Sequence, residues 1–241
     1  MKKKFFLEEV VEYTFKKYKN LKNLNIIFPN RRAGLYFQKA LSKKIEKPIF
    51  SPKIQTLEEF VQNHTDFKIA NDTTDNIILI HILFKIIKKY QEDEAKVTFE
   101  KFYYWGQILL NDFDDIDQSL EDESKIFKSI KNQKEIEENF KFLDKENYDS
   151  IKSFWIKFFP KMTINQKNFH NTWKILLKVY KDFKNELFNK GIGYKGLVYK
   201  DFSKNLNKRI FQNKDDEYLF VGFSMLSNAE KNIIKFFISE F

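Results

Sequence analysis

The chain has 241 residues, no cysteine and a net charge of +9, with 43 Lys and Arg against 34 Asp and Glu. This length allows one large domain or two small ones. Without cysteine the chain forms no disulfide, has no thiol nucleophile and holds no thiolate-bound zinc, and it suits a reducing cytoplasm. No stretch approaches 18 uncharged apolar residues, and Glu8, Glu9 and Glu12 interrupt the segment that follows the basic start. We therefore expect neither a membrane helix nor an export signal.

The charge is distributed unevenly along the chain. Residues 1–60 hold 14 Lys and Arg against 6 Asp and Glu, a net charge of +8. Residues 61–150 have a net charge of −8, and residues 151–241 one of +9. Basic surfaces attract nucleic acid, but lysine-rich helices also occur because they keep a protein solvated. Charge alone leaves both interpretations open.

The first 60 residues have an α/β pattern. Apolar residues at three- and four-residue spacing predict an amphipathic helix over residues 2–20. Ile26–Phe28 is a short apolar run typical of a buried strand, and Pro29 ends it because proline has no N–H to donate. Asn30–Gly34 is predicted to be a polar turn, and residues 35–41 begin a helix. Strand, tight loop and helix in this order open many nucleotide-binding domains.

The predicted turn lacks the residues that bind a nucleotide phosphate. A phosphate-binding loop has the pattern G-x-x-x-x-G-K-[ST], in which glycines let the backbone wrap the phosphates, lysine neutralises them and the hydroxyl holds magnesium. Asn30–Gly34 has one glycine, two arginines (Arg31 and Arg32) and no lysine. The strand, turn and helix of the motif are predicted here, but the lysine and the hydroxyl residue that bind phosphate and magnesium are missing.

A second strand and helix are predicted next. Pro48–Ile54 contains two prolines, which favour extended backbone in their neighbours. Thr56, with Glu59 three residues later, is a capping box that starts a helix through Val61.

From Thr73 onward the apolar spacing is helical, and the helical part of the chain is about 140 residues long. Asp72 or Thr73 caps the first of these helices, and Gly191, Gly193 and Gly196 interrupt the pattern near its end. The other helices are expected at Phe99–Leu110, Ile126–Ile130, Lys134–Leu143, Tyr148–Phe159, Asn168–Leu187 and Leu197–Asn205.

The chain ends with a last strand and helix. Tyr218–Phe223 is predicted to be a strand, and Ser227 with Glu230 forms a second capping box. The order α/β, helical, β/α predicts a parallel sheet that carries a large helical insertion, with the last strand returning to the sheet.

Four stretches of the sequence resemble one protein family. These are Ile27–Gly34 (IFPNRRAG), Pro48–Val61, Phe99–Leu120 and Tyr218–Phe237. They are similar to the N-terminus of helicase/nuclease proteins related to the B subunit of the ATP-dependent helicase–deoxyribonuclease AddAB, in the form found in Bacteroidetes-type bacteria. The resemblance covers nearly the whole chain.

The resemblance implies a degenerate RecA-like fold of the superfamily 1 helicase type. Residues 1–65 would be the first part of the α/β domain, 66–212 an inserted helical subdomain and 213–241 the returning strand and helix. Members of the family are several times longer and end in a PD-(D/E)XK nuclease domain. This chain would then be the N-terminal portion of such a nuclease.

The second ATPase motif is also expected to be missing. In such helicases an acidic pair at the end of a strand holds magnesium and positions the attacking water. This chain has Val221, Gly222 and Phe223 there, without a carboxylate between Glu217 and Glu230. The resemblance implies a Gly-Phe pair at this place, and Gly222-Phe223 fits it. We therefore expect no ATP hydrolysis, no catalytic residue and no cofactor in this segment.

Four residues are candidates for contact with DNA. Arg31 and Arg32 stand where phosphates would meet the loop. In one interpretation they contact a nucleic-acid backbone or a partner protein. In the other they pair with acidic residues of the chain or face solvent. The resemblance adds Lys53 and Thr56, because helicases of this class commonly touch single-stranded DNA after the second strand.

The densest acidic cluster is Asp112–Asp117. Carboxylates suit magnesium or calcium, but the spacing matches no EF-hand, and no nuclease core can be placed with its strands. Phe113 and Ile116 look buried, so the pattern favours a helix end or turn with a solvated acidic side, and no metal is predicted. His64, His81 and His170 are expected to be structural or exposed, and Trp105, Trp155 and Trp173 to lie in the core.

The sequence thus favours a non-catalytic DNA-handling module in recombinational repair of double-strand breaks. Its partners would be DNA with a single-stranded or duplex end, an AddA-like motor subunit and the C-terminal nuclease portion, all in the cytoplasm and without a membrane. Two alternatives stay open. One is a docking module that contacts only protein, and the other is an NTPase with an atypical phosphate loop.

Overall fold

The computed structural model describes residues 5–18, 20–90, 98–129, 166–207 and 215–240, with only the backbone for 166–174 and 240. The helices expected at 134–143 and 148–159 lie outside the described residues, as do Trp155 and the side chains of His170 and Trp173. The chain forms two compact units. Unit 1 comprises residues 1–66 and 201–241, and unit 2 comprises residues 67–200.

Unit 1 is built on a parallel sheet of three strands. Its order is β2 (Lys53–Thr56), β1 (Leu24–Phe28) and β5 (Glu217–Phe220). The central strand β1 is buried along its whole length, as strands of parallel sheets usually are. The prediction that the last strand returns to a sheet begun by the first strand is confirmed, because β1 pairs with β5.

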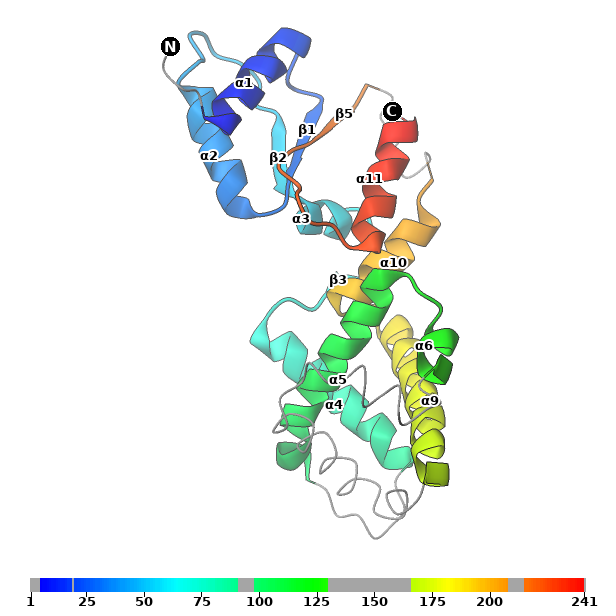
Figure 1. Cartoon of the computed structure of the whole chain (residues 1–241). Coiled ribbons are helices and arrows are strands. Elements are labelled where there is room, and N and C mark those ends of the chain that lie inside the picture. Colours follow the sequence, from blue (N-terminus) through cyan, green and yellow to red (C-terminus); the bar gives the residue numbers. More distant parts are fainter. Residues whose placement is uncertain (1–4, 19, 91–97, 130–165, 208–214, 241) are drawn as a thin grey trace. The chain divides into compact units, whose positions relative to one another are not determined.

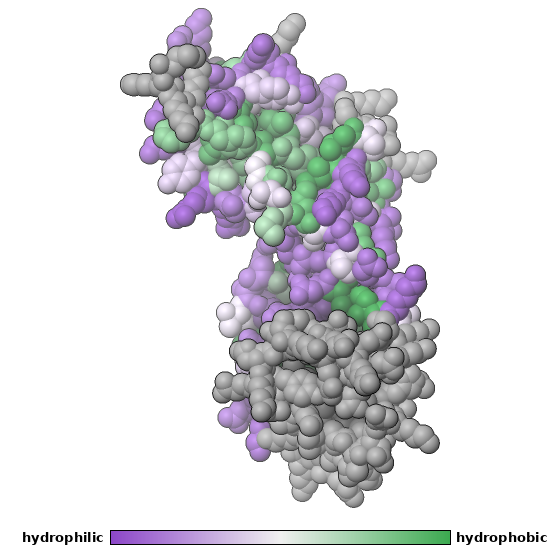
Figure 2. All heavy atoms as spheres, viewed as in Figure 1, coloured by the Kyte–Doolittle hydropathy of each residue, from purple (hydrophilic) through white to green (hydrophobic). Residues whose placement is uncertain are grey.

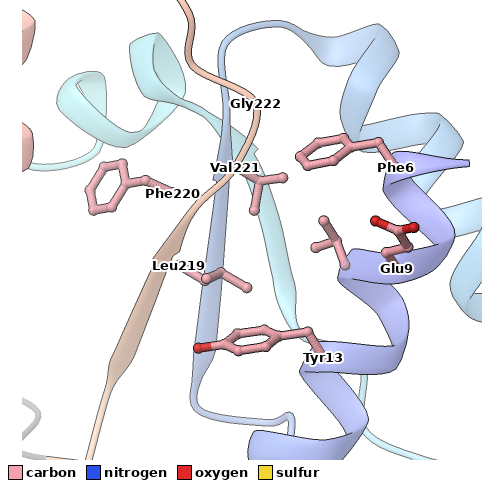
Figure 3. A pocket seen from close by; sticks show the side chains of 8 residues that line it. Phe6, Glu9, Tyr13, Leu219, Phe220, Val221 and Gly222 are labelled. Carbon is pink, nitrogen blue, oxygen red and sulfur yellow. The ribbon is translucent and has the colours of Figure 1, made fainter.

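Helices α1 (Phe6–Lys17) and α2 (Arg31–Ser42) cover one face of this sheet (Figure 1). The side chains of β5 alternate, so Leu219 and Val221 point to α1 while Phe220 points to the opposite face (Figure 3). The buried core of the α1 and α2 side is Val11, Tyr18, Leu21, Leu24, Ile26, Phe28, Phe37, Leu41 and Val221.

Aromatic residues form the core on the other face of the sheet. Phe60 of α3 (Leu57–Gln62) and Phe237 of α11 (Asn228–Glu240) have ring centroids 5.4 Å apart. Tyr218 and Phe220 of β5 lie 4.7 Å and 5.4 Å from Phe237. Such pairs add about 0.5–1.5 kcal/mol each beyond the area they bury. Both predicted capping boxes, at the starts of α3 and α11, are confirmed.

Unit 2 is a helical unit with a small parallel pair of strands, β3 (Lys68–Ile69) and β4 (Ile192–Gly193). Within the described residues, no helix is both long and apolar enough to cross a membrane. The helices of unit 2 are α4 (Thr73–Lys89), α5 (Phe99–Ser119), α6 (Glu123–Ser129), α9 (Gln166–Lys190) and the first part of α10 (Lys195–Asn205).

Helix α5 runs further than the sequence indicates. It was expected to end at Leu110, but it continues to Ser119 and ends at Leu120 in a left-handed conformation. The sequence favours a helix end or turn with a solvated acidic side after Leu110. Phe113 is buried in unit 2 as expected, but Asp117 is buried with it. Of the four aspartates in the acidic cluster, Asp117 is thus buried and Asp114 is partly buried.

Asp117 is fully buried and is the centre of a polar network. Its carboxylate accepts hydrogen bonds of 2.6 Å from both Tyr180 and Tyr194. The ammonium groups of Lys184 and Lys200 lie 3.0 Å and 2.8 Å from the same carboxylate. Asp117 therefore joins the end of α5 to α9 and α10.

The prediction of a solvated acidic side for residues 112–117 is wrong for Asp117. Burial by itself raises its pKa, but Lys184, Lys200 and the two tyrosine hydroxyls outweigh burial and hold the pKa below its usual value. Asp114 accepts a hydrogen bond from the Gly196 N–H. A side chain at Gly196 would collide with the backbone of Asp114, so that position requires glycine.

We predict that Asp117→Asn lowers the free energy of unfolding by about 3 kcal/mol, because the buried ammonium of Lys200 and the partly buried ammonium of Lys184 would lose their counter-charge. Urea denaturation measures this loss. The matched control is Asp115→Asn on the exposed side of α5, which should change stability by less than about 0.5 kcal/mol.

The same pair of variants has an expected pH dependence. The pKa of Asp117 is lower in the folded than in the unfolded state, so its stabilising effect is complete above the unfolded pKa of about 3.9. It is lost as the pH falls through the folded pKa. Equal stabilities of the wild type and Asp117→Asn at pH 7 would contradict the network.

Candidate nucleic-acid interface

The carboxyl ends of the three parallel strands meet at one edge of the sheet in unit 1. Phe28 at the end of β1 pairs with Thr56 at the end of β2. On the other side the Val221 N–H donates to the Ile27 carbonyl over 2.9 Å. Ligands of α/β proteins commonly bind at this edge, against the residues that follow each strand.

Only Pro29 and Asn30 separate β1 from α2. The prediction that Asn30–Gly34 is a turn is therefore wrong, since α2 begins at Arg31. Asn30 is the N-cap, and its side chain accepts a hydrogen bond of 2.9 Å from the Ala33 N–H. Asparagine favours both turns and N-caps, which explains the error.

Gly34 is a packing residue of α2 and not a loop residue. A Cβ at Gly34 would lie 3.1 Å from the Ile54 side chain of β2. The connection from strand to helix is too short to wrap around a phosphate chain, because a phosphate-binding loop needs several residues between the two. One amide of the first helical turn, that of Ala33, is already capped.

Arg31 connects the starts of two helices. Its Nε lies 2.8 Å from Glu59 Oε1, while the arginine side chain is 80% exposed. Glu59 also accepts from the Thr56 N–H over 2.8 Å. This hydrogen bond lowers the pKa of Glu59 most, burial opposes it, and the Arg31 guanidinium adds to the lowering.

The structure brings Arg31, Arg32 and Thr56 to the same edge of the sheet and leaves Lys53 away from them. Thr56 is buried, and its hydroxyl accepts from the Glu59 N–H over 3.1 Å, so it serves as the cap of α3. Lys53 pairs with Asn25 at the amino end of β2. Three residues of strand, about 10 Å, separate Lys53 from Thr56.

The end of β5 presents no carboxylate at this edge. Val221 is buried, and Gly222 has a φ of +77°, a left-handed conformation that favours glycine. The next acidic residue, Glu230, accepts from the Ser227 N–H in the capping box of α11. Gly222 and Phe223 therefore turn the chain away from the sheet and hold no group suited to magnesium.

A basic face on α2 was not recognised in the sequence. Its exposed side carries Arg32, Lys39 and Lys43, together with Tyr36, which is 58% exposed. α2 contains no Asp or Glu. In the part of the chain that the structure describes, these three cations have no carboxylate within 4 Å, whereas Arg31 is paired. The spacing of four, three and four residues from Arg32 through Tyr36 and Lys39 to Lys43 was the available signal, because it places the four residues on one side of a helix.

A hollow of about 290 Å³ lies between α1 and β5 in unit 1 (Figure 3). On the side of unit 1 that Figure 2 shows, hydrophobic residues gather around the sheet. The hollow is lined mainly by apolar side chains such as Phe6, Tyr13 and Val221, with Glu9 as its one charged residue. A negatively charged, cation-free lining does not suit a phosphate, so the hollow is no candidate for nucleotide binding.

The described residues contain no group of three or more His, Asp or Glu that could hold a metal ion. His64 is partly buried against Phe60, and burial lowers its pKa. His81 packs against Phe99, with ring centroids 5.2 Å apart. Both histidines thus have structural contacts.

No protein-family model matches this chain, and no curated protein or solved structure matches it either. The resemblance to AddB-like proteins therefore stays a prediction. The edge of the sheet and the basic face of α2 have to be interpreted from their own chemistry.

We predict that 5 mM ATP with magnesium leaves the melting temperature of the chain unchanged relative to 5 mM triphosphate. A ligand that binds the folded state must stabilise it by mass action, by about 2.7 kcal/mol at 100 times its dissociation constant. Differential scanning fluorimetry measures the effect. A rise specific to ATP would show that the chain binds nucleotide and would contradict this prediction.

Proposed function

We propose that this chain is a non-catalytic, DNA-handling module with a degenerate RecA-like core, part of a bacterial helicase–nuclease that processes double-strand breaks. The parallel order β2-β1-β5 and the helical unit within the chain are consistent with that plan. The four stretches that resemble AddB-like proteins supply the context of recombinational repair. Its further partners would be an AddA-like motor subunit and a C-terminal nuclease portion, in the cytoplasm.

The observation that carries the proposal is the basic face of α2, defined as Arg32, Tyr36, Lys39 and Lys43. Phosphate contacts of Arg and Lys dominate affinity for nucleic acid. From Arg32 to Lys43 the helix rises about 16 Å, which spans about five phosphates at the 3.4 Å spacing of one duplex strand. The exposed ring of Tyr36 lies between the cations and can stack on an unpaired base.

The N-terminus of α2 also favours the binding of a phosphate. The helix dipole favours an anion there, and Arg31 and Arg32 are the first two residues of the helix. Glu59 weakens this effect, because it pairs with Arg31 and places a negative charge beside it. We infer that DNA competes with Glu59 for Arg31.

A second candidate function is docking of protein alone. It is favoured by large apolar side chains that unit 1 leaves exposed, such as Phe50 at 71% and Met225 at 91%. Exposed apolar surface commonly marks contacts with other proteins. This function predicts that the chain has negligible affinity for DNA at moderate salt.

We predict that Arg32→Glu/Lys39→Glu abolishes most of the binding of a labelled oligonucleotide with a single-stranded tail. Fluorescence anisotropy at several salt concentrations measures the affinity. Loss of two phosphate contacts should also lower the slope of log K against log salt by about 1.4 to 1.8.

The matched control for this experiment is Lys204→Glu/Lys235→Glu. It makes the same change of net charge on exposed residues of α10 and α11. If both double variants weaken binding equally, the effect comes from net charge alone, and the role of α2 would be refuted. If the wild type does not bind at low salt, protein docking becomes the better account.

We predict that Glu59→Gln strengthens binding of the same oligonucleotide by about twofold to fivefold. The substitution removes the exposed ion pair with Arg31, which is worth up to about 1 kcal/mol. Glutamine can still complete the capping box with Thr56, so α3 should stay folded. Circular dichroism checks the fold, and unchanged or weaker binding would show that Arg31 does not contact DNA.

A further inference from the structure

Helix α4 in unit 2 is apolar on nearly all sides. Only His81 and Lys85 interrupt the apolar run from Ile77 to Ile87. A helix of this kind is normally buried all round. Ile77 and Ile78, however, are 41% and 44% exposed. One side of α4 therefore has the composition of a contact surface.

A groove of about 590 Å³ follows this exposed side of α4. Ile78, Ile82 and Ile86 of α4 contribute apolar side chains to it, and Phe99 at the start of α5 adds an aromatic ring. The last turns of α9 form the opposite wall. The groove thus lies between two helices and has an apolar lining.

The rim of this groove is basic. Lys85 and Lys89 of α4 and Lys190 of α9 line it, together with one carboxylate, Glu186. Glu186 is paired with Lys190 over 3.2 Å. Lys85 and Lys89 have no carboxylate within 4 Å among the described residues. The rim therefore has a surplus of positive charge, although residues 61–150 as a whole are acidic.

The cations lie at both ends of the groove. β3 leads into α4, β4 follows α9, and the two strands pair. The carboxyl end of α9, with Lys190, therefore lies beside the start of α4. Lys85 and Lys89 lie near the other end of α4. From Ile78 to Lys89 the helix rises about 16 Å, the length of three helical turns.

We propose that the groove between α4 and α9 is a docking site for an amphipathic helix of a partner protein. The occupant would present about three turns of aliphatic side chains to the isoleucines. It would carry acidic residues toward both of its ends, opposite Lys190 and opposite Lys85 and Lys89. This mode of recognition is independent of the basic face of α2.

The groove suits a helix better than other ligands. Ile78, Ile82 and Ile86 are spaced by four residues along one side of α4. Ile82 and Ile86 are buried at the floor of the groove and Ile78 is exposed at one end, so the side-chain rows of a second helix can pack over them. An extended strand would leave its backbone polar groups unpaired, since the walls are helices whose own backbone groups are already bonded. A single-headed anionic lipid would use the cations at only one end.

The test uses the whole 241-residue chain and a labelled 18-residue peptide with leucines along one helical face and glutamates at both ends. Fluorescence anisotropy should show saturable binding. In spectra of isoleucine δ1-methyl groups, Ile77, Ile78, Ile82 and Ile86 should shift, while Ile26 and Ile27 of unit 1 should not. The variant Lys85→Glu/Lys89→Glu should weaken binding about tenfold.

Two controls separate the groove from general effects. Lys101→Glu/Lys125→Glu makes the same charge change on exposed residues of unit 2 that do not line the groove, and it should bind like the wild type. Ile78→Asp should also abolish binding, while Tyr104→Asp, at a residue 60% exposed on α5, should not. The exposure of both residues makes folded variants the expected result, and thermal melts verify it.

Several results would overturn the proposal. A peptide with lysine in place of each glutamate that binds equally well would show that the rim charges play no part. Methyl shifts confined to other isoleucines would place the contact elsewhere. Displacement of the peptide by decanoate below its micelle concentration would assign the groove to an amphiphile. Concentration-dependent self-association of the chain through the isoleucines of the groove would assign the groove to a second copy.

Discussion

The two-residue connection between β1 and α2 constrains what unit 1 can do. Because α2 starts at Arg31, the connection after β1 is too short to enclose a phosphate chain. The same connection places Arg31 and Arg32 on the first turn of a helix, whose exposed side continues with Tyr36 and Lys39. The exposed basic side of α2 is the surface that we propose contacts a polymer of phosphates along its length.

The two units use charge in different ways. In unit 2 the charged residues Asp117 and Lys200 are buried and Lys184 is partly buried beside them, and their ion pairs hold α5, α9 and α10 in one arrangement. In unit 1 the cations of α2 are exposed and lack carboxylate partners among the described residues, apart from Arg31. Buried pairs lose stability when one partner is removed, whereas exposed cations are available to a ligand. Net charge alone does not distinguish these two roles.

Local sequence signals predicted much of the fold. The apolar run before Pro29 marked β1, and Thr56 with Glu59 marked the start of α3 to the residue. Asn30 was misread because asparagine favours a turn and an N-cap alike, and only the packing of Gly34 on Ile54 decides for the helix. The burial of Asp117 could not be predicted, since its four partners lie more than 60 residues away in the chain. The basic face of α2 was visible in the spacing from Arg32 to Lys43, once the helix was known to begin at Arg31.

The most direct test of the account is photocrosslinking of the chain to a single-stranded oligonucleotide that carries 5-iododeoxyuridine, followed by mass spectrometry of the crosslinked peptides. If DNA follows α2, the crosslinks fall within residues 31–43, with Tyr36 the expected site. Crosslinks confined to other segments, or none at a concentration where anisotropy shows saturated binding, would contradict a DNA-handling role for the basic face of α2.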